Sequence, residues 1–388
     1  MSRDRAIDAL RAYAIGGVVL GHWLVTGLVL NGDGGLHQAS PLTARPGLAP
    51  VTWVLQTLGL FFFTAGFGST RSLARSGERA GGWLARRLRR LLLPCWRCSG
   101  GRRRTARRHR GRHPDDTLTV ALRLAVSPLW FLLPLVILVA MTGPLRAAVR
   151  RWGGAMRDTG GGRGRVRRPG RPPAAGRHRP ATGHRGGGLV GAVPAGVAHA
   201  DGRLVGRRAG GILAAGGAVA LVALLALGYP VSAVGVPGAG VSNLNPPSLL
   251  VVALAVTQVG LGLLARPAVE RLLTRPVPGR AVVEVNRSAV RIYLWHQPVL
   301  VAVTTLTARS GLALPGLHTD PGNPGWVVAR FCWLPLLAAV LVTAVRAGQP
   351  RSPRQPGGGG SPAGRPSASG RQRRCTIIDV PARPTCRR

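Results

Sequence analysis

Apolar residues in this chain gather in long blocks, and the first block carries two polar residues with a regular spacing. Residues 12–30 are almost wholly apolar, with His22 in the middle and Arg11 immediately before the block. About 19 apolar residues are enough to cross a bilayer as a helix. At ~100° per residue, the step from Arg11 to His22 returns to within ~20° of the same helix face, ~16 Å further along the axis. Ionisable groups at membrane depth are costly, so this stripe is a candidate functional site.

Further blocks along the chain also have the length and composition of membrane spans. With the first block, the expected spans are 12–30, 51–68, 118–142, 209–227, 248–265, 289–306 and 326–345. The pattern therefore predicts an all-α fold, a polytopic transmembrane helix bundle with about seven to eight recognisable spans. This domain is expected over residues 1–347, and residues 348–388 read as a disordered basic tail rich in Pro, Gly, Ser and Arg.

The charge distribution predicts how the bundle sits in a cell membrane. The net charge is +41, and all 53 basic side chains are arginines that lie between and after the apolar blocks. Basic loops are expected in the cytoplasm. They are the N-terminus, 71–90, 266–287 and the tail, whereas 31–50, 229–247 and 307–325 are nearly uncharged. We therefore expect a multi-pass protein with a cytoplasmic N-terminus and tail, and one further crossing between residues 91 and 117.

Two windows break the apolar pattern. Residues 97–116 and 157–200 are rich in Arg, Gly and Pro and have no hydrophobic periodicity. An arginine costs about 2.5–3.5 kcal/mol at the centre of a membrane helix, so the first window is not an ordinary span. Our hypothesis is that both windows are read in a shifted frame of a GC-rich gene and have lost helices. The alternative is a pair of natural disordered cytoplasmic loops, and resequencing the gene distinguishes the two.

Several short motifs follow one another in a recognisable order. They are Ile7-Asp8-x-Leu10-Arg11 before His22, Leu60-Phe-Phe-Phe63 with Gly66-Phe67, Arg87-Leu-Arg89-Arg90-Leu-x-x-Pro94, Pro128-Leu-Trp130-Phe-Leu132 and Ile292-Tyr293-Leu-Trp295-His296. In these motifs the chain resembles the membrane-bound acyltransferase-3 family over about 1–96, 118–153 and 205–345. The resemblance implies about ten spans. It also implies transfer of an acyl group from cytoplasmic acyl-CoA, with acetyl-CoA as the expected donor, to a hydroxyl of a carbohydrate or other small acceptor.

His22 is the candidate catalytic residue. An acceptor hydroxyl is a poor nucleophile until a base removes its proton, and imidazole titrates near pH 6.5, which suits that task. Together with the matching face of Arg11, the resemblance assigns this role to His22. The alternative is a core histidine that forms a hydrogen bond between helices.

The remaining candidates are substrate-binding residues. Arg11, Arg87 and Arg90 offer guanidinium forks that suit the phosphates of coenzyme A. Their alternative role is that of basic anchors at the cytoplasmic edge. Trp130, Tyr293 and His296 would line an acyl or acceptor pocket, and helix packing or a place at the membrane interface is the alternative for them.

Other classes of protein fit the pattern less well. A transporter or flippase could use His22 as a proton relay, but the expected spans contain no Asp or Glu to share the proton. An RNA-binding protein would not need apolar spans, so no nucleic acid is expected. A damaged, inactive acyltransferase stays open because of the two windows. The expected partners are the lipid bilayer, acyl-CoA and a hydroxylated acceptor such as a sugar, a polysaccharide or a secondary metabolite, with no metal and no bound cofactor.

Overall fold

The structure, a computed structural model, divides the chain into two units, Met1–Gly348 and Gln349–Arg388. The second unit lies outside the described residues. The described residues are 4–32, 35–77, 79–90, 92, 115–126, 132–158, 192–202, 204, 206–236, 242–244 and 247–348.

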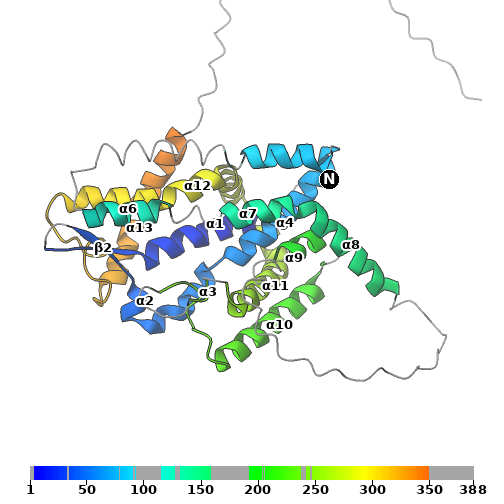
Figure 1. Ribbon diagram of the computed structural model, residues 1–388, viewed down its shortest axis with the longest axis horizontal. Helices are drawn as coiled ribbons and strands as arrows, with labels where there is room; N and C mark the ends of the chain where they lie inside the picture. Colours follow the sequence, from blue (N-terminus) through cyan, green and yellow to red (C-terminus); the bar gives the residue numbers. More distant parts are fainter. Residues whose placement is uncertain are drawn as a thin grey trace, which may run out of the picture. The chain divides into compact units, whose positions relative to one another are not determined.

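The first unit is built mainly from α-helices (Figure 1). The elements are α1 (Arg5–Val25), β1 (Gly27–Leu30), β2 (Leu36–Ala39), α2 (Pro41–Ala44), the 3-10 helix η1 (Pro46–Val51), α3 (Thr52–Leu55), α4 (Leu58–Ser76), a helix over 80–90, α6 (Asp115–Val126), α7 (Leu132–Ala140), α8 (Thr142–Asp158), α9 (Ala192–Ala200), α10 (Arg207–Ala226), α11 (Leu249–Leu272), α12 (Pro276–Ala308) and α13 (Trp326–Ala347).

The first helix lies inside the bundle, against α4, α11, α12 and α13. It begins at an N-cap, where the Asp4 carboxylate accepts from the Ile7 backbone N–H at 3.2 Å. It ends at Val25, five residues before the predicted end. The next residues pair with Leu36–Ala39 in an antiparallel hairpin, so the all-α expectation is wrong at this point. The backbone packs closely here, because a Cβ on Gly27 would lie 2.5 Å from Pro321 Cγ.

The predicted span 51–68 is a broken helix, with α3 and α4 separated at Gln56 and Thr57. The break lies against the middle of α1. Thr57 Oγ1 donates to the Ala14 carbonyl at 2.7 Å. A Cβ on Gly17 would lie 2.7 Å from Thr57 Oγ1, so α1 and the break are in close contact. Gln258 of α11 donates to the Gln56 carbonyl at 3.1 Å. A side chain of a neighbouring helix thus satisfies a backbone carbonyl that the break exposes, as a buried break requires.

Four helical stretches are long and apolar enough to cross a membrane, or up to five if the bent pair of α7 and α8 counts as one span. They are Pro46–Ser76, Arg207–Ala226, Leu249–Leu272 and Trp326–Ala347. This count covers only the described residues and does not reach the seven to eight spans expected. The predicted span 118–142 is divided into α6 and α7, with residues 127–131 outside the described part. The predicted span 289–306 is the second half of the longer α12.

Two helices that pack on α1, α12 and α11, run in opposite directions. α12 runs parallel to it, because Asn286 donates to the Asp8 carbonyl at 2.8 Å and Trp23 Nε1 donates to the His296 carbonyl at 2.9 Å. α11 runs antiparallel, since Arg266 near its C-terminal end forms an ion pair with Asp4 at 3.0 Å. The basic segments at the start of α1, the end of α11 and the start of α12 therefore share one end of the bundle.

The described residues before and after 93–114 lie near opposite ends of α1. Arg87 in the helix 80–90 lies near Arg11, at the start of α1. Thr117 instead accepts a hydrogen bond from the Leu36 backbone N–H at 2.8 Å, next to the hairpin that follows the end of α1 (Figure 1). Residues 93–114 lie outside the described part of the chain, so the further crossing expected there stays a prediction.

The last nine residues of the second irregular window, 192–200, are not irregular, because they form α9. This helix packs tightly on α4. Val193 and Val197 are buried, and a Cβ on Gly196 would collide with the Phe63 backbone. The glycine at position 196 lets α9 and α4 approach closely. Residues 159–191 of the window lie outside the described residues. Residues 97–114 of the first window lie outside the described residues, and Asp115 and Asp116 begin α6.

Candidate active site

A polar cluster lies where α1 meets α12. The rings of His22 and His296 are 5.2 Å apart between centroids, with a tilt of 45°. Gln297 places its side-chain amide 3.1 Å from His22 Nδ1. His296 and Gln297 are 0% and 1% exposed, whereas His22 is partly buried. The structure thus brings His22 and His296 together, and it adds a glutamine that the sequence did not single out.

The second histidine has a defined proton position. His296 Nδ1 lies 2.7 Å from the Tyr293 carbonyl oxygen. A carbonyl oxygen only accepts, so Nδ1 carries the proton and donates it to this oxygen. The Tyr293 and His296 rings are 5.7 Å apart, so the predicted residue Tyr293 belongs to the same cluster. Its position three residues before His296 places both on one face of α12.

The far end of α1 is held by a buried arginine of α13 that the sequence analysis missed. Arg330 is 0% exposed and donates to the carbonyls of Trp23 at 2.7 Å, Thr26 at 2.5 Å and Gly316 at 2.9 Å. A cation at a helix C-terminus interacts favourably with the helix dipole. Arg330 therefore fixes the last turn of α1, which carries His22. The sequence signal that could have identified Arg330 was its position as a charged residue inside an apolar block.

The three predicted arginines lie close to one another at the opposite end of α1. Burial lowers the pKa of the Arg87 guanidinium, and the positive charges of Arg11 and Arg90 lower it further. The Nε atom of Arg87 is buried and has no hydrogen-bond partner in the described part of the chain. A cluster of positive charges in a partly buried place favours a bound anion, because the anion offsets the repulsion between them.

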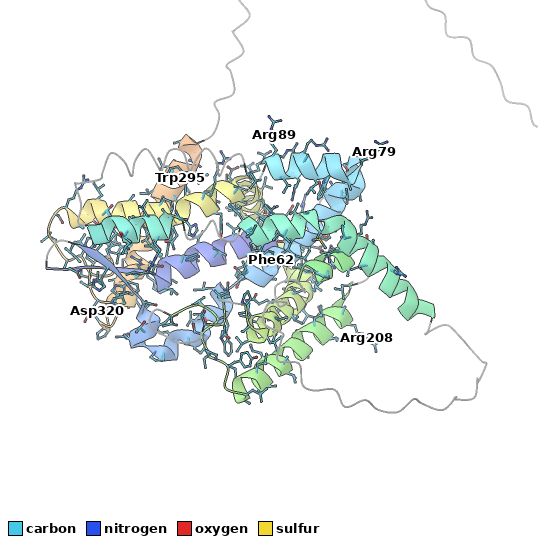
Figure 2. The ribbon with its side chains drawn as sticks, viewed as in Figure 1. Phe62, Arg79, Arg89, Arg208, Trp295 and Asp320 are labelled. Atoms are coloured by element: carbon cyan, nitrogen blue, oxygen red, sulfur yellow. The ribbon has the colours of Figure 1, made fainter. Side chains whose placement is uncertain are left out.

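A cavity of about 360 Å³ opens beside these arginines, large enough for a small ligand. Its lining residues are Ser72, Arg75, Ser76, Trp83, Arg86, Arg87 and Arg90, with no acidic side chain among the described residues. The cavity lies between the end of α4 and the helix 80–90, which are joined by the hydrogen bond from Trp83 Nε1 to Ser72 Oγ at 3.0 Å. By contrast, Arg79 and Arg89 point away from the bundle (Figure 2).

Several lining residues of this cavity were missed by the sequence analysis. Ser72, Arg75 and Ser76 have the i, i+3 and i+4 spacing of one helix face, as do Trp83, Arg86 and Arg87. That spacing was the available signal, but it did not separate these arginines from the many others. The predicted residue Trp130 lies outside the described residues.

No group of three or more His, Cys, Asp or Glu side chains is placed to hold a metal ion in the ranges that the structure describes. The polar groups of the candidate site are the imidazoles, the amide and the guanidiniums. A histidine pair at the contact of two helices can exchange a proton with a bound hydroxyl, and a cationic cavity can hold phosphates.

Apolar helices around the pair of His22 and His296, with a cationic cavity at one end, define a membrane protein with an internal polar site. Comparison with known families makes this more specific. Residues 4–158 match the family described as "Acyltransferase domain", Acyl_transf_3. The match covers residues 4–158 of the 388, and over this part the chain is similar to the acyltransferase-3 family. His22, Arg11, Arg87 and Arg90 lie inside the matched range, and Tyr293 and His296 lie outside it.

Searches of curated proteins and of solved structures gave no match.

Proposed function

We propose that the protein is an integral membrane O-acyltransferase that moves an acyl group from cytoplasmic acyl-CoA to a hydroxyl of a carbohydrate or other small acceptor. One observation carries the proposal. A single helix, α1, has Arg11 beside Arg87 at one end and His22 against His296 towards the other. The N-terminus and the tail are cytoplasmic in this proposal, so the arginine end faces the pool of acyl-CoA.

The phosphates of coenzyme A suit the arginine end. Its pyrophosphate and its 3′-phosphate together carry several negative charges. Guanidinium groups bind such oxygens in pairs of parallel hydrogen bonds. The clustering of Arg11, Arg87 and Arg90 supports this role, because a bound polyanion relieves the repulsion that lowers the pKa of Arg87. The neighbouring cavity has room for part of the nucleotide.

The length of coenzyme A also fits the spacing along α1. About twelve bonds separate the pyrophosphate from the thioester sulfur, the length of about four extended residues, or ~14 Å. Eleven residues of helix separate Arg11 from His22, which corresponds to ~16 Å. With its phosphates at the arginines, an extended pantetheine arm therefore brings the thioester to the level of His22.

At that level, His22 acts as the general base. It takes the proton of the acceptor hydroxyl while the hydroxyl oxygen attacks the thioester carbonyl. The tetrahedral intermediate then collapses, the carbon–sulfur bond breaks and the thiolate of coenzyme A leaves. The imidazolium returns its proton to that thiolate, so the products are the ester and free coenzyme A. His296, Tyr293 and Trp130 would line the acyl or acceptor pocket.

The test is turnover of radiolabelled acetyl-CoA in membranes from cells that express the full chain, measured as release of free coenzyme A. We expect His22→Ala to lower turnover by about 100- to 10,000-fold, the usual contribution of a general base. Equal turnover in the His22→Ala variant would exclude His22 as the base. No turnover in either protein, with both present in the membrane, would identify an inactive acyltransferase.

A further inference from the structure

We propose that Gln297 is a positioning residue that holds the proton of His22 on Nδ1 and so leaves Nε2 free to take the acceptor proton. The inference rests on the proposed function, in which His22 is the base. It adds a specific role for a neutral side chain on α12 that contacts His22 directly.

The environment of Gln297 needs an explanation. Its side chain is 1% exposed, and its amide lies 3.1 Å from His22 Nδ1. Its Oε1 atom is buried and has no hydrogen-bond partner within the described ranges. A half-turn exchanges the oxygen and the nitrogen of a side-chain amide, so either atom can stand at this distance from His22 Nδ1.

The two orientations of the amide have opposite consequences for His22. When Gln297 Nε2 faces Nδ1, the amide donates to the Nδ1 lone pair. The proton of the ring is then on Nε2, and no free lone pair is left to accept another. A half-turn of the amide puts Oε1 at this place, where it accepts from Nδ1–H. The Nε2 lone pair is then free, and His22 can act as a base.

The second orientation also suits the protonated ring. Once His22 has taken the acceptor proton, both of its nitrogens are donors, and only Oε1 can pair with Nδ1–H. Gln297 thus stabilises the imidazolium as it forms. A carboxylate would do so more strongly, but it is expensive at membrane depth. A neutral amide also leaves the imidazolium acidic enough to return its proton to the thiolate of coenzyme A.

The other groups near His22 do not replace this contact. His296 faces the His22 ring, but its Nδ1 atom is bound to the Tyr293 carbonyl. Tyr293 itself contacts the His296 ring. On α13, Arg330 binds the backbone of Trp23 and Thr26 through its guanidinium. Among the described contacts of His22, Gln297 is the one side chain placed to hydrogen-bond Nδ1.

The test compares Gln297→Leu and Gln297→Glu in membranes that contain the full chain, with release of coenzyme A from acetyl-CoA followed across pH. For Gln297→Leu we expect kcat to fall by about 10- to 150-fold, the rate equivalent of a hydrogen bond to a charged group. KM for acetyl-CoA should not change, because the arginine end is untouched. For Gln297→Glu we expect most of the activity to return, with the acid limb of the pH profile moved to higher pH, because a carboxylate favours the imidazolium.

Gln258→Leu is the matched control. Gln258 is also a glutamine with a buried, unpaired Oε1, but it binds the backbone at the break before α4. Its loss should lower stability without moving the pH profile. If both Gln297 variants keep the wild-type kcat and pH profile while His22→Ala is inactive, the role of Gln297 is excluded. If His22→Ala keeps its turnover, the proposed function itself fails. If Gln297→Leu does not accumulate in the membrane, the pH profile of Gln297→Glu tests the proposal alone. An acid limb at the wild-type pH would then exclude the role of Gln297.

Discussion

Replacement of Arg87 by glutamine should separate binding of the acyl donor from stability of the protein. The guanidinium of Arg87 is partly buried, and burial together with Arg11 and Arg90 lowers its pKa. Its Nε atom has no partner among the described residues. In the unliganded protein the charge of Arg87 is therefore repelled and poorly solvated. Its removal should leave the thermal midpoint unchanged or raise it.

The effect on acyl-CoA binding should be opposite in sign. One hydrogen bond between charged groups is worth about 1.5–3 kcal/mol, and a bidentate phosphate contact contains two. The relieved repulsion from Arg11 and Arg90 offsets part of this loss. We take a net loss of about 1.5–3 kcal/mol, which raises KM for acetyl-CoA by about 10- to 150-fold. The kcat at saturating donor should change little, because Arg87 lies near Arg11, and His22 is ~16 Å further along α1 from Arg11.

Arg89→Gln is the matched control, since Arg89 is in the same helix and points away from the bundle (Figure 2). Turnover of acetyl-CoA in membranes gives KM, and thermal unfolding in detergent gives the midpoint. An unchanged KM for Arg87→Gln would refute the placement of the phosphates at this site. A loss of thermal stability with an unchanged KM would show instead that the arginine cluster is structural.

Three further outcomes follow from contacts within the bundle. Gly196→Val should prevent accumulation of folded protein, because the new side chain meets the Phe63 backbone, and immunoblots of membrane fractions measure this. Arg330→Gln should lower the thermal midpoint in detergent, since each buried carbonyl left unpaired at the end of α1 costs about 1–3 kcal/mol; an unchanged midpoint would contradict the role of Arg330 as a cap. Trp23→Phe should destabilise the protein by about 0.5–1.5 kcal/mol through loss of the bond to the His296 carbonyl, measurable by denaturant unfolding.

Much of the helix pattern could be predicted, because length and apolarity decide which segments can span a membrane. The helices α10 and α13 begin and end within two residues of the expected spans. The first helix was overestimated, since Gly27–Leu30 is as apolar as the helix before it. Its strand conformation depends on pairing with Leu36–Ala39, which lies beyond the span. The start of α12 was missed because its first turns are polar and arginine-rich.

The candidate site could be predicted only in part. Arg11 and His22 were accessible because they interrupt or border an apolar helix at a regular spacing. Gln297 was not, since a single glutamine beside aromatic residues has no distinctive pattern, and its contact with His22 joins positions 275 residues apart. Arg75 and Arg86 of the cavity were missed, because only the packing of α4 against the helix 80–90 distinguishes them from the other arginines among the 53.

The continuity of α1 determines which motions the proposed reaction can tolerate. Arg11 and His22 lie on one unbroken helix, attached to Asn286 near its start and to Arg330 at its end. The distance between Arg11 and His22 along the helix axis is therefore fixed, and rearrangements of neighbouring helices leave it unchanged. In the proposed reaction the reach from phosphate to thioester stays constant, which ties donor selection to the pantetheine arm more than to the acyl chain.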